Sequence, residues 1–246
     1  MERLDKLLSG TGHWSRREVK ELVRQGRVQV SGQAALKAEQ KVDPVSDTLE
    51  VDGVPVSCGE FTYVMLNKPA GVLSAVEDRK QKTVLDLLPQ HLRRRGLSPV
   101  GRLDKDSEGL ILLTNQGDLV NKIMKASNGH EKEYVVTVDK PVTAKFIEKM
   151  SAGVYLDELD VTTRECEVRA TGKREFTIIL TQGLNRQIRR MCETLGFHVQ
   201  TLKRVRIMNL RLGNLKTGTY RKVSKEEYEE LCELLDGPAF EEEWEE

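Results

Sequence analysis

The residues best suited to chemistry lie in one short stretch, 100 to 115. A polar loop there carries Asp104, Asp106 and Glu108 and then enters the apolar run Leu110–Leu113. Such a run favours a strand buried on both faces, although its periodicity also fits a buried helix. Carboxylates held at the mouth of a buried element can act as nucleophiles or bases. Because most Asp-rich loops are only solvated turns, the loop alone leaves both interpretations open.

The same loop partly imitates a calcium site. Asp104-x-Asp106-x-Glu108-Gly109 has the spacing of half an EF-hand loop, but Asn115 stands where that loop needs a bidentate Glu. Nucleotide-binding, zinc-protease and nucleophile-elbow motifs are absent, and the four histidines show no ligand spacing. We therefore expect no metal and no cofactor. An enzyme with this sequence has to use carboxylate, hydroxyl and arginine groups.

Composition limits the class of protein. The chain has 246 residues, of which 38% are hydrophobic and 32% charged, which suits one medium or two small globular domains. No apolar segment approaches the roughly 20 residues that span a bilayer. The first residues lack the pattern of a signal peptide, so a cytoplasmic protein is expected. The four cysteines have no Cys-x-x-Cys spacing, which indicates neither a zinc site nor a disulfide framework.

Charge is unevenly distributed along the chain. The formal net charge is +0, which by itself argues against a nucleic-acid partner. Between Leu184 and Lys222, however, Glu193 is the only acidic residue among ten basic ones, whereas Lys225 is the only basic residue after Ser224. This asymmetry is compatible with polyanion binding, but ordinary solvated faces would also produce it.

Residues 1–57 are expected to form a separate small module. Two amphipathic helices are indicated, and Ser15 and Glu18 have the spacing of a capping box at the start of the second. Gly26 is a suitable stop for that helix. Basic residues recur every four positions along its exposed side, which predicts one stripe made of Arg16, Lys20 and Arg24.

Residues 61–236 are expected to form a second domain that positions the Asp-rich loop. Strand and helix patterns mix there without regular alternation, so the predicted fold class is α+β with a mixed, largely antiparallel sheet. The acidic residues 237–246 are expected to be disordered. Predicted strands cover 61–66, 110–113, 132–138, 166–168, 176–180 and 202–207, and predicted helices cover 83–88, 118–126, 143–150, 185–195 and 225–235.

The first module resembles the small RNA-binding domain first seen in ribosomal protein S-four. The segments Arg3–Leu8, Ser15–Glu18 and Gly26–Gly32 carry the resemblance. It implies contact with structured RNA through the second helix, mainly at phosphates, which gives affinity and orientation but little sequence choice. The RNA-contacting residues that it implies are Arg16, Arg17, Lys20, Arg24 and Arg27.

The second domain resembles the pseudouridine synthases that act on ribosomal RNA. Four ordered stretches carry this resemblance: Asn67–Gly71, Gly101–Asn115, Lys132–Tyr134 and Gly183–Met191. With the first module, the similarity extends to about Leu235. It implies a two-domain isomerase that needs no cofactor.

The resemblance also implies catalytic roles for three residues. Asp104 would be the nucleophile, and Arg189 would form a bidentate ion pair with it, because an adjacent cation favours the ionised form of a carboxylate. Tyr134 would stack on the uracil and help to remove the proton from carbon 5; its alternative is a strand tyrosine packed at the edge of the core.

Further residues would bind the substrate. Arg102 would fill the gap left by the flipped base or hold a phosphate, unless it only pairs with Asp106. Leu103 and Ile188 would form walls of the pocket. The phosphate-binding residues implied at the rim are Arg186, Arg190, Lys203, Arg204 and Arg206.

Within the family, the segments 118–123, 130–134, 150–154 and 182–187 are most similar to the F-type synthases of large-subunit rRNA. The implied partners are 23S rRNA and the anticodon region of tyrosine tRNA, with the protein acting as a monomer. A non-catalytic RNA-binding factor in ribosome assembly is the alternative from another class. The combination of Asp104, Tyr134 and Arg189 argues against it, because RNA binding alone does not require those groups.

Overall fold

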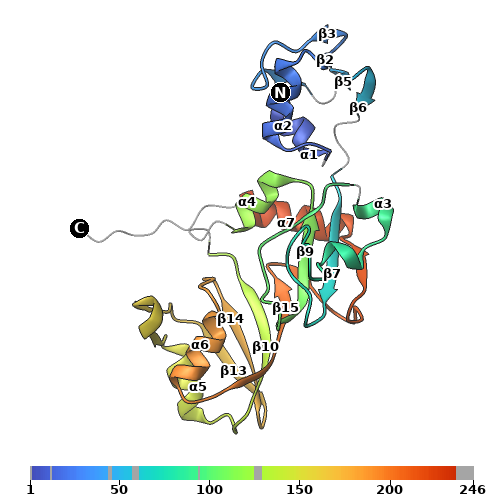
Figure 1. Cartoon of the computed structure of the whole chain (residues 1–246). Helices are drawn as coiled ribbons and strands as arrows, with labels where there is room; N and C mark the ends of the chain where they lie inside the picture. Colours follow the sequence, from blue (N-terminus) through green and yellow to red (C-terminus); the bar gives the residue numbers. More distant parts are fainter. Residues whose placement is uncertain are drawn as a thin grey trace, which may run out of the picture.

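The computed structural model describes residues 2–11, 13–43, 46–56, 61–93, 95–124 and 129–236. The boundary expected at residues 57–60 and the acidic segment 237–246 lie outside this part of the chain. Figure 1 shows the small N-terminal part at one end of the molecule and the larger part beyond it.

The N-terminal part consists of helices and short strands around their own core. Helix α2 (Arg16–Arg24) begins at the predicted capping box: the Glu18 amide donates to Ser15 Oγ at 3.2 Å, and the Ser15 amide donates to Glu18 Oε2 at 2.6 Å. It packs with α1 (Leu4–Gly10) against a sheet of order β3-β2-β5-β6. The strands are β1 (Glu2–Arg3), β2 (Val28–Val30), β3 (Gln33–Ala34), β4 (Lys41–Val42), β5 (Leu49–Val51) and β6 (Val54–Val56).

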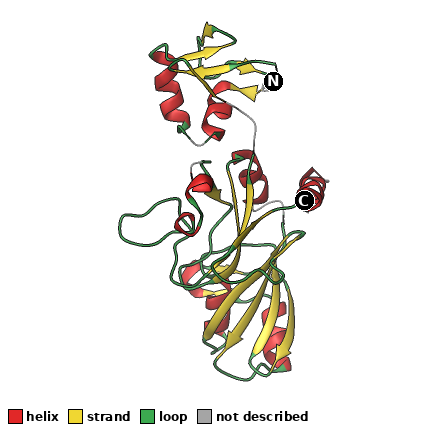
Figure 2. Ribbon diagram, turned by 90° about the vertical axis from the view of Figure 1, so that its right-hand side faces the viewer, coloured by secondary structure: helices red, strands yellow, loops and turns green. Residues whose placement is uncertain are grey.

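The larger part is built on one continuous sheet of order β13-β14-β10-β15-β9-β7-β17 (Figure 2). All neighbours along it are antiparallel except β15 and β9, so the predicted mixed, largely antiparallel α+β fold is confirmed. Its strands are β7 (Tyr63–Lys68), β8 (Ser98–Pro99), β9 (Glu108–Thr114), β10 (Lys132–Val138), β13 (Glu167–Gly172), β14 (Glu175–Leu180), β15 (Val199–Ile207), β16 (Leu210–Arg211) and β17 (Tyr220–Lys222), with β11 (Tyr155–Leu156) and β12 (Val161–Thr162) forming a separate pair.

Helices cover this sheet in two groups. One half, around β10 and β14, forms a core with α5 and α6, and the other half, around β7 and β9, forms cores on both of its faces. Leu110 and Leu112 belong to one of these cores and Ile111 and Leu113 to the other, which confirms a strand buried on both sides. The helices are α3 (Gln90–Arg93), α4 (Gly117–Met124), α5 (Ala144–Ser151), α6 (Gln187–Thr194) and α7 (Lys225–Asp236), with 3-10 turns at Leu85–Leu87 and Asp157–Leu159.

Two details differ from the sequence-based expectation. The helix expected over 83–88 is only the 3-10 turn Leu85–Leu87. The helix expected from residue 185 begins at Gln187, because Arg186 adopts a left-handed backbone conformation with φ 50° and ψ 32°. Within the described ranges, no helix is long and apolar enough to cross a membrane.

The two halves of the sheet join over a short contact. Strands β9 and β15 share only two register pairs, Glu108 with Lys203 and Gly109 with Arg204. Gly109 has φ +102°, and a Cβ atom there would lie 2.2 Å from the Arg204 carbonyl oxygen. This close approach requires glycine directly after the Asp-rich loop.

Replacing Gly109 by alanine tests this junction. Gly109→Ala should lower the free energy of unfolding by about 3 kcal/mol or more, through backbone strain and the clash with Arg204. Gly213 is a matched control, because it has φ +55° but no heavy atom within 4 Å of an added Cβ. Gly213→Ala should cost only about 1 kcal/mol. If urea unfolding shows that Gly109→Ala and Gly213→Ala lose the same free energy of unfolding, the account of the junction is contradicted.

Candidate active site

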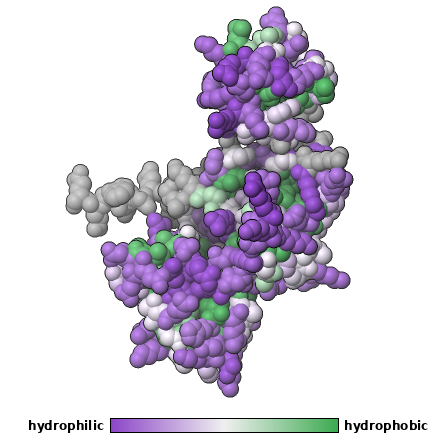
Figure 3. Space-filling view, viewed as in Figure 1, coloured by the Kyte–Doolittle hydropathy of each residue, from purple (hydrophilic) through white to green (hydrophobic). Residues whose placement is uncertain are grey.

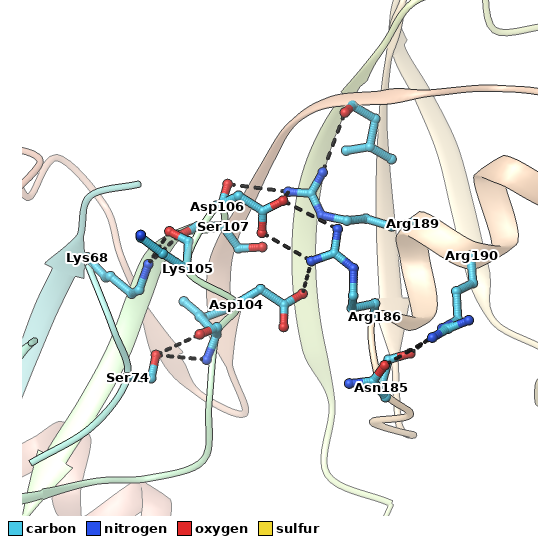
Figure 4. Close-up of polar contacts among 12 residues, drawn as sticks. Lys68, Ser74, Asp104, Lys105, Asp106, Ser107, Asn185, Arg186, Arg189 and Arg190 are labelled. Atoms are coloured by element: carbon cyan, nitrogen blue, oxygen red, sulfur yellow. Dashed lines mark hydrogen bonds and ion pairs between the residues drawn. The ribbon is translucent and has the colours of Figure 1, made fainter. Parts of the chain in front are cut away.

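The Asp-rich loop forms a tight turn that is fixed from below by a buried lysine. The Ser107 amide donates to the Asp104 carbonyl at 3.1 Å and closes the turn. Lys68, at the end of β7, is 0% exposed, and its Nζ donates to the carbonyls of Pro69 at 3.1 Å, Lys105 at 3.2 Å and Ser107 at 2.7 Å (Figure 4). These contacts hold the backbone on either side of Asp106.

Burial also changes the ionisation of this lysine. It lowers the pKa of Lys68 to about 8, against the opposing effect of the negative charges of Asp106, Asp104 and Glu108. Its ammonium group is bound by carbonyl oxygens rather than by a carboxylate at ion-pair distance. The side chain therefore supports the turn through hydrogen bonds and leaves the carboxylates available to other cations.

Those other cations lie at the start of α6, in the opposite half of the sheet: Arg186 is the N-cap residue of this helix, and Arg189 lies in its first turn. Asp104 Oδ2 lies 3.6 Å from Arg186 Nη1. Asp106 lies 3.4 Å from Arg186 and 3.1 Å from Arg189. Burial alone would raise the pKa of Asp106, but the hydrogen bond from Arg186 and the charge of Arg189 bring it below its usual value. Figure 4 shows the Asp104 carboxylate pointing toward Arg186, and that of Asp106 lying against both Arg186 and Arg189.

A hollow of about 770 Å³ opens beside these charges. Ser74 joins its two walls: its hydroxyl donates to the Leu103 carbonyl at 2.8 Å, and the Leu103 amide donates to the same oxygen at 3.0 Å. The volume is in the range of small-molecule sites. The segment 70–75 contributes mainly small and apolar residues to the lining, whereas the segment 102–106 and Arg186 contribute the charged ones. The lining residues are Ala70, Gly71, Leu73, Ser74, Ala75, Arg102, Leu103, Asp104, Lys105, Asp106 and Arg186.

The ion pair expected between Asp104 and Arg189 is not the one that the structure shows. Arg189 pairs with Asp106, and Arg186 is the arginine that contacts Asp104. Arg102 lines the hollow as an exposed side chain and forms no ion pair with Asp106. Both carboxylates of the turn therefore pair with arginines at the start of α6.

Tyr134 lies in the same row of the sheet as the junction. It pairs in register with Arg204 on β15, which pairs with Gly109 on β9. Its ring is half-buried and packs against the core, and it does not line the hollow. Ile188, expected as a pocket wall, is only 4% exposed and lies in the core beneath α6, because the first turn of that helix directs it toward the sheet.

Two arginines expected to bind phosphates are instead buried. Arg204 is 3% exposed and donates from Nε to the Leu110 carbonyl at 2.8 Å. Arg206 is 8% exposed and donates to Glu133 at 2.8 Å and Glu131 at 2.9 Å. Their guanidinium groups satisfy internal acceptors, so this part of the prediction is corrected.

The remaining residues expected at the rim, Arg190 and Lys203, differ in how far they are free to bind a phosphate. Arg190 donates to the Asn185 carbonyl at 3.0 Å and pairs with Glu158. Lys203 is half-buried. Sequence reasoning assigned no role to Lys68 or Ser74, and the only ion pair that it offered Asp106 was with Arg102. A lysine inside the buried strand β7 was the available signal for Lys68, whereas the contacts of Ser74 depend on the tertiary fold.

The buried ammonium of Lys68 predicts a pH dependence of stability. The pKa of Lys68 in the folded chain is about 8, whereas the usual pKa of a lysine is 10.5. The unfolded chain therefore binds more protons between these values, and the contribution of Lys68 to stability rises with pH. The free energy of unfolding of the unsubstituted chain minus that of Lys68→Met should increase across this window by up to about 3 kcal/mol.

Urea unfolding at several pH values measures this difference. Lys225→Met is the control, because Lys225 has an 82% exposed side chain, and its curve should run parallel to that of the unsubstituted chain. A difference between the chain and Lys68→Met that stays constant with pH would contradict the assignment.

Comparisons with known proteins agree with this arrangement. The family model for RNA pseudouridylate synthase matches residues 62–194, and that for the S4 domain matches residues 2–49. The dual-specificity RNA pseudouridine synthase RluF of Escherichia coli K12 is 45% identical over 242 residues, 97% of this chain and 81% of the relative. The ribosomal large subunit pseudouridine synthase B of Bacillus subtilis is 36% identical over 240 residues, 96% and 98% of the two chains.

A solved structure described as a pseudouridylate synthase is also similar. It has a TM-score of 0.68 and 27% identity, and the match covers 94% of this chain and 100% of that one. The turn with Asp104, the arginines of α6 and the hollow between them thus lie inside the matched catalytic region. The chain belongs to the RNA pseudouridine synthase family and is an RNA-modifying isomerase with an N-terminal S4 domain.

Proposed function

We propose that this enzyme converts one uridine of 23S rRNA into pseudouridine, with Asp104 as its nucleophile. The observation that carries the proposal is the position of Asp104: it lines a hollow of about 770 Å³ and lies 3.6 Å from the Arg186 guanidinium. The similarity to RluF supports an F-type target. We propose that the enzyme acts in the cytoplasm, as a monomer and without a cofactor, with residues 1–57 as the RNA-binding domain and 61–236 as the catalytic domain.

The reaction is balanced without any external reagent. The bond between ribose carbon 1′ and uracil N1 breaks, the base turns, and carbon 5 bonds to carbon 1′. Carbon 5 loses a proton and N1 gains one, so the formula is unchanged. Asp104 would attack carbon 1′ or carbon 6, or remove a ribose proton on a glycal route. The base must first leave the RNA helix, which costs a few kcal/mol.

The walls of the hollow suit the proposed substrate. Leu73 and Leu103 offer apolar contacts to the faces of a flipped uracil, and the charged wall provides Asp104. Exposed Arg102 at the rim can fill the gap left by the base or bind a phosphate. Tyr134 would reach the base only after the RNA is bound, because it does not line the hollow in the free chain.

The S4 domain offers two unpaired cations on α2. Arg16 and Arg17 are exposed and form no ion pair within the described residues. The other implied RNA-binding residues are engaged: Lys20 pairs with Glu39 at 2.8 Å, Arg24 with Glu21 at 2.7 Å, and Arg27 with Asp52 at 2.5 Å. Figure 3 shows mainly hydrophilic residues on the visible surface of this part. Phosphate binding should therefore depend most on Arg16 and Arg17.

Asp104→Asn tests the nucleophile. The variant keeps the shape of the side chain but lacks an ionised carboxylate, so pseudouridine formation should fall by at least about 10³-fold. Affinity for an rRNA stem-loop should be retained. Chemical mapping of pseudouridine in treated RNA measures the product, with Asp157→Asn as the matched control, because Asp157 is exposed and does not line the hollow. Full product with Asp104→Asn would contradict the assignment.

Arg16→Gln/Arg17→Gln tests the S4 surface. Removing two phosphate contacts should weaken RNA binding and reduce the slope of log Kd against log salt by about 1 to 2. Arg169→Gln, which removes a remote exposed cation on β13, should leave both quantities unchanged. Single-turnover chemistry at saturating enzyme should persist in the double variant. An unchanged Kd and salt slope would show that this face of α2 does not bind RNA.

The range of RNA targets is a further part of the proposal. The RluF relatives are named dual-specificity enzymes, so we propose that tyrosine tRNA is a second substrate. The similarity to the B-type enzyme of Bacillus subtilis favours, as the second candidate, a different uridine of large-subunit rRNA. Pseudouridine mapping of rRNA and tRNA from cells that lack the protein distinguishes these possibilities.

A further inference from the structure

The arginines of α6 bind the two carboxylates of the turn unequally. Asp106 faces Arg186 with both oxygens, each 3.4 Å from a guanidinium nitrogen. It also contacts Arg189 Nη2 twice, through Oδ2 at 3.1 Å and through its backbone carbonyl at 3.3 Å. Asp104 has a single ion-pair contact within the described residues, at 3.6 Å to Arg186. Asp106 is therefore the main acidic partner of both arginines.

Arg189 depends on this partner for its position. Its side chain is only 8% exposed, and Asp106 is its carboxylate at ion-pair distance. Its Nη1 donates to the Val199 carbonyl at a long 3.5 Å, and its Nε has no partner among the described residues. The Asp106 side chain is 51% exposed, but removing its charge would leave the buried guanidinium of Arg189 without a carboxylate partner. The charge of Asp106 thus decides where the Arg189 guanidinium lies.

Arg186 depends on Asp106 for geometry rather than for stability. Its side chain is 42% exposed, and exposed ion pairs contribute little to stability. Its left-handed backbone, with φ 50°, is strained for a residue other than glycine. Such a weak pair does not account for a strained residue through stability. It does hold Arg186 Nη1 between Asp106 Oδ1 at 3.4 Å and Asp104 Oδ2 at 3.6 Å.

We propose that Asp106 is a positioning residue for pseudouridine formation. It holds Arg186 with both carboxylate oxygens, so that one guanidinium nitrogen faces Asp104, and it fixes Arg189 behind this pair. Asp106 thus affects the reaction of the uridine indirectly, by positioning the two arginines. The inference rests on the proposed role of Asp104 as nucleophile. It assigns a function to a carboxylate that otherwise only shapes the loop.

A double-mutant cycle tests the proposal. The measured quantities are the single-turnover rate of pseudouridine formation and the Kd for the same rRNA stem-loop, for the unsubstituted enzyme, Asp106→Asn, Arg186→Gln and the double variant. A misplacement of about 1 Å can cost about 10²-fold. We therefore expect each single variant to lose about 10²-fold in rate with little change in Kd. Asp106→Glu, which keeps the charge, should recover part of the rate.

The double variant separates positioning from a general structural effect. If Asp106 acts through Arg186, Asp106→Asn should add little in the Arg186→Gln background, whereas independent effects would multiply. Unchanged rates in Arg186→Gln would overturn the proposal even if Asp106→Asn does not fold. Multiplying effects, or no recovery with Asp106→Glu, would also overturn it. Activity in Asp104→Asn would instead overturn the proposed function, so the two failures are distinguishable.

Discussion

The short parallel contact between β9 and β15 is the constraint on which the active site depends. It brings the Gly109 backbone against the Arg204 carbonyl, so that a Cβ would lie at 2.2 Å. The turn with Asp104 belongs to one half of the sheet, with β7 and β9, whereas Arg186 and Arg189 lie at the start of α6 in the other half. Neither half contains a complete site. The strands must approach this closely for Asp104 and Asp106 to meet Arg186 and Arg189.

The charged groups around the turn differ in burial, and this difference separates their roles. Lys68 supports the turn from within through carbonyl contacts, and burial lowers its pKa to about 8. Arg189 is buried against Asp106, while Arg186 stays half-exposed beside the hollow. Lys68 and Arg189 are thus shielded from water. Arg186, Asp104 and Asp106 remain partly exposed beside the hollow.

The sequence predicted the fold class, the buried strand around Leu112 and the capping box at Ser15, because these follow from local patterns of apolar and capping residues. It also indicated the family through four separated motifs. It could not predict which arginine faces which aspartate, because that pairing depends on the left-handed backbone at Arg186 and on the register of β15. For the same reason Arg204 and Arg206 were predicted to be surface cations. In the structure they are buried at a bulge in β15 and donate to internal acceptors.

A structure of the enzyme bound to an rRNA stem-loop tests the central claim most directly. The account predicts a flipped uridine in the hollow beside Leu73 and Leu103. Its reacting carbon should lie about 3–3.5 Å from an oxygen of Asp104, the separation of a near-attack geometry. A target base that stays stacked in the RNA, or that is bound away from Asp104, would contradict it.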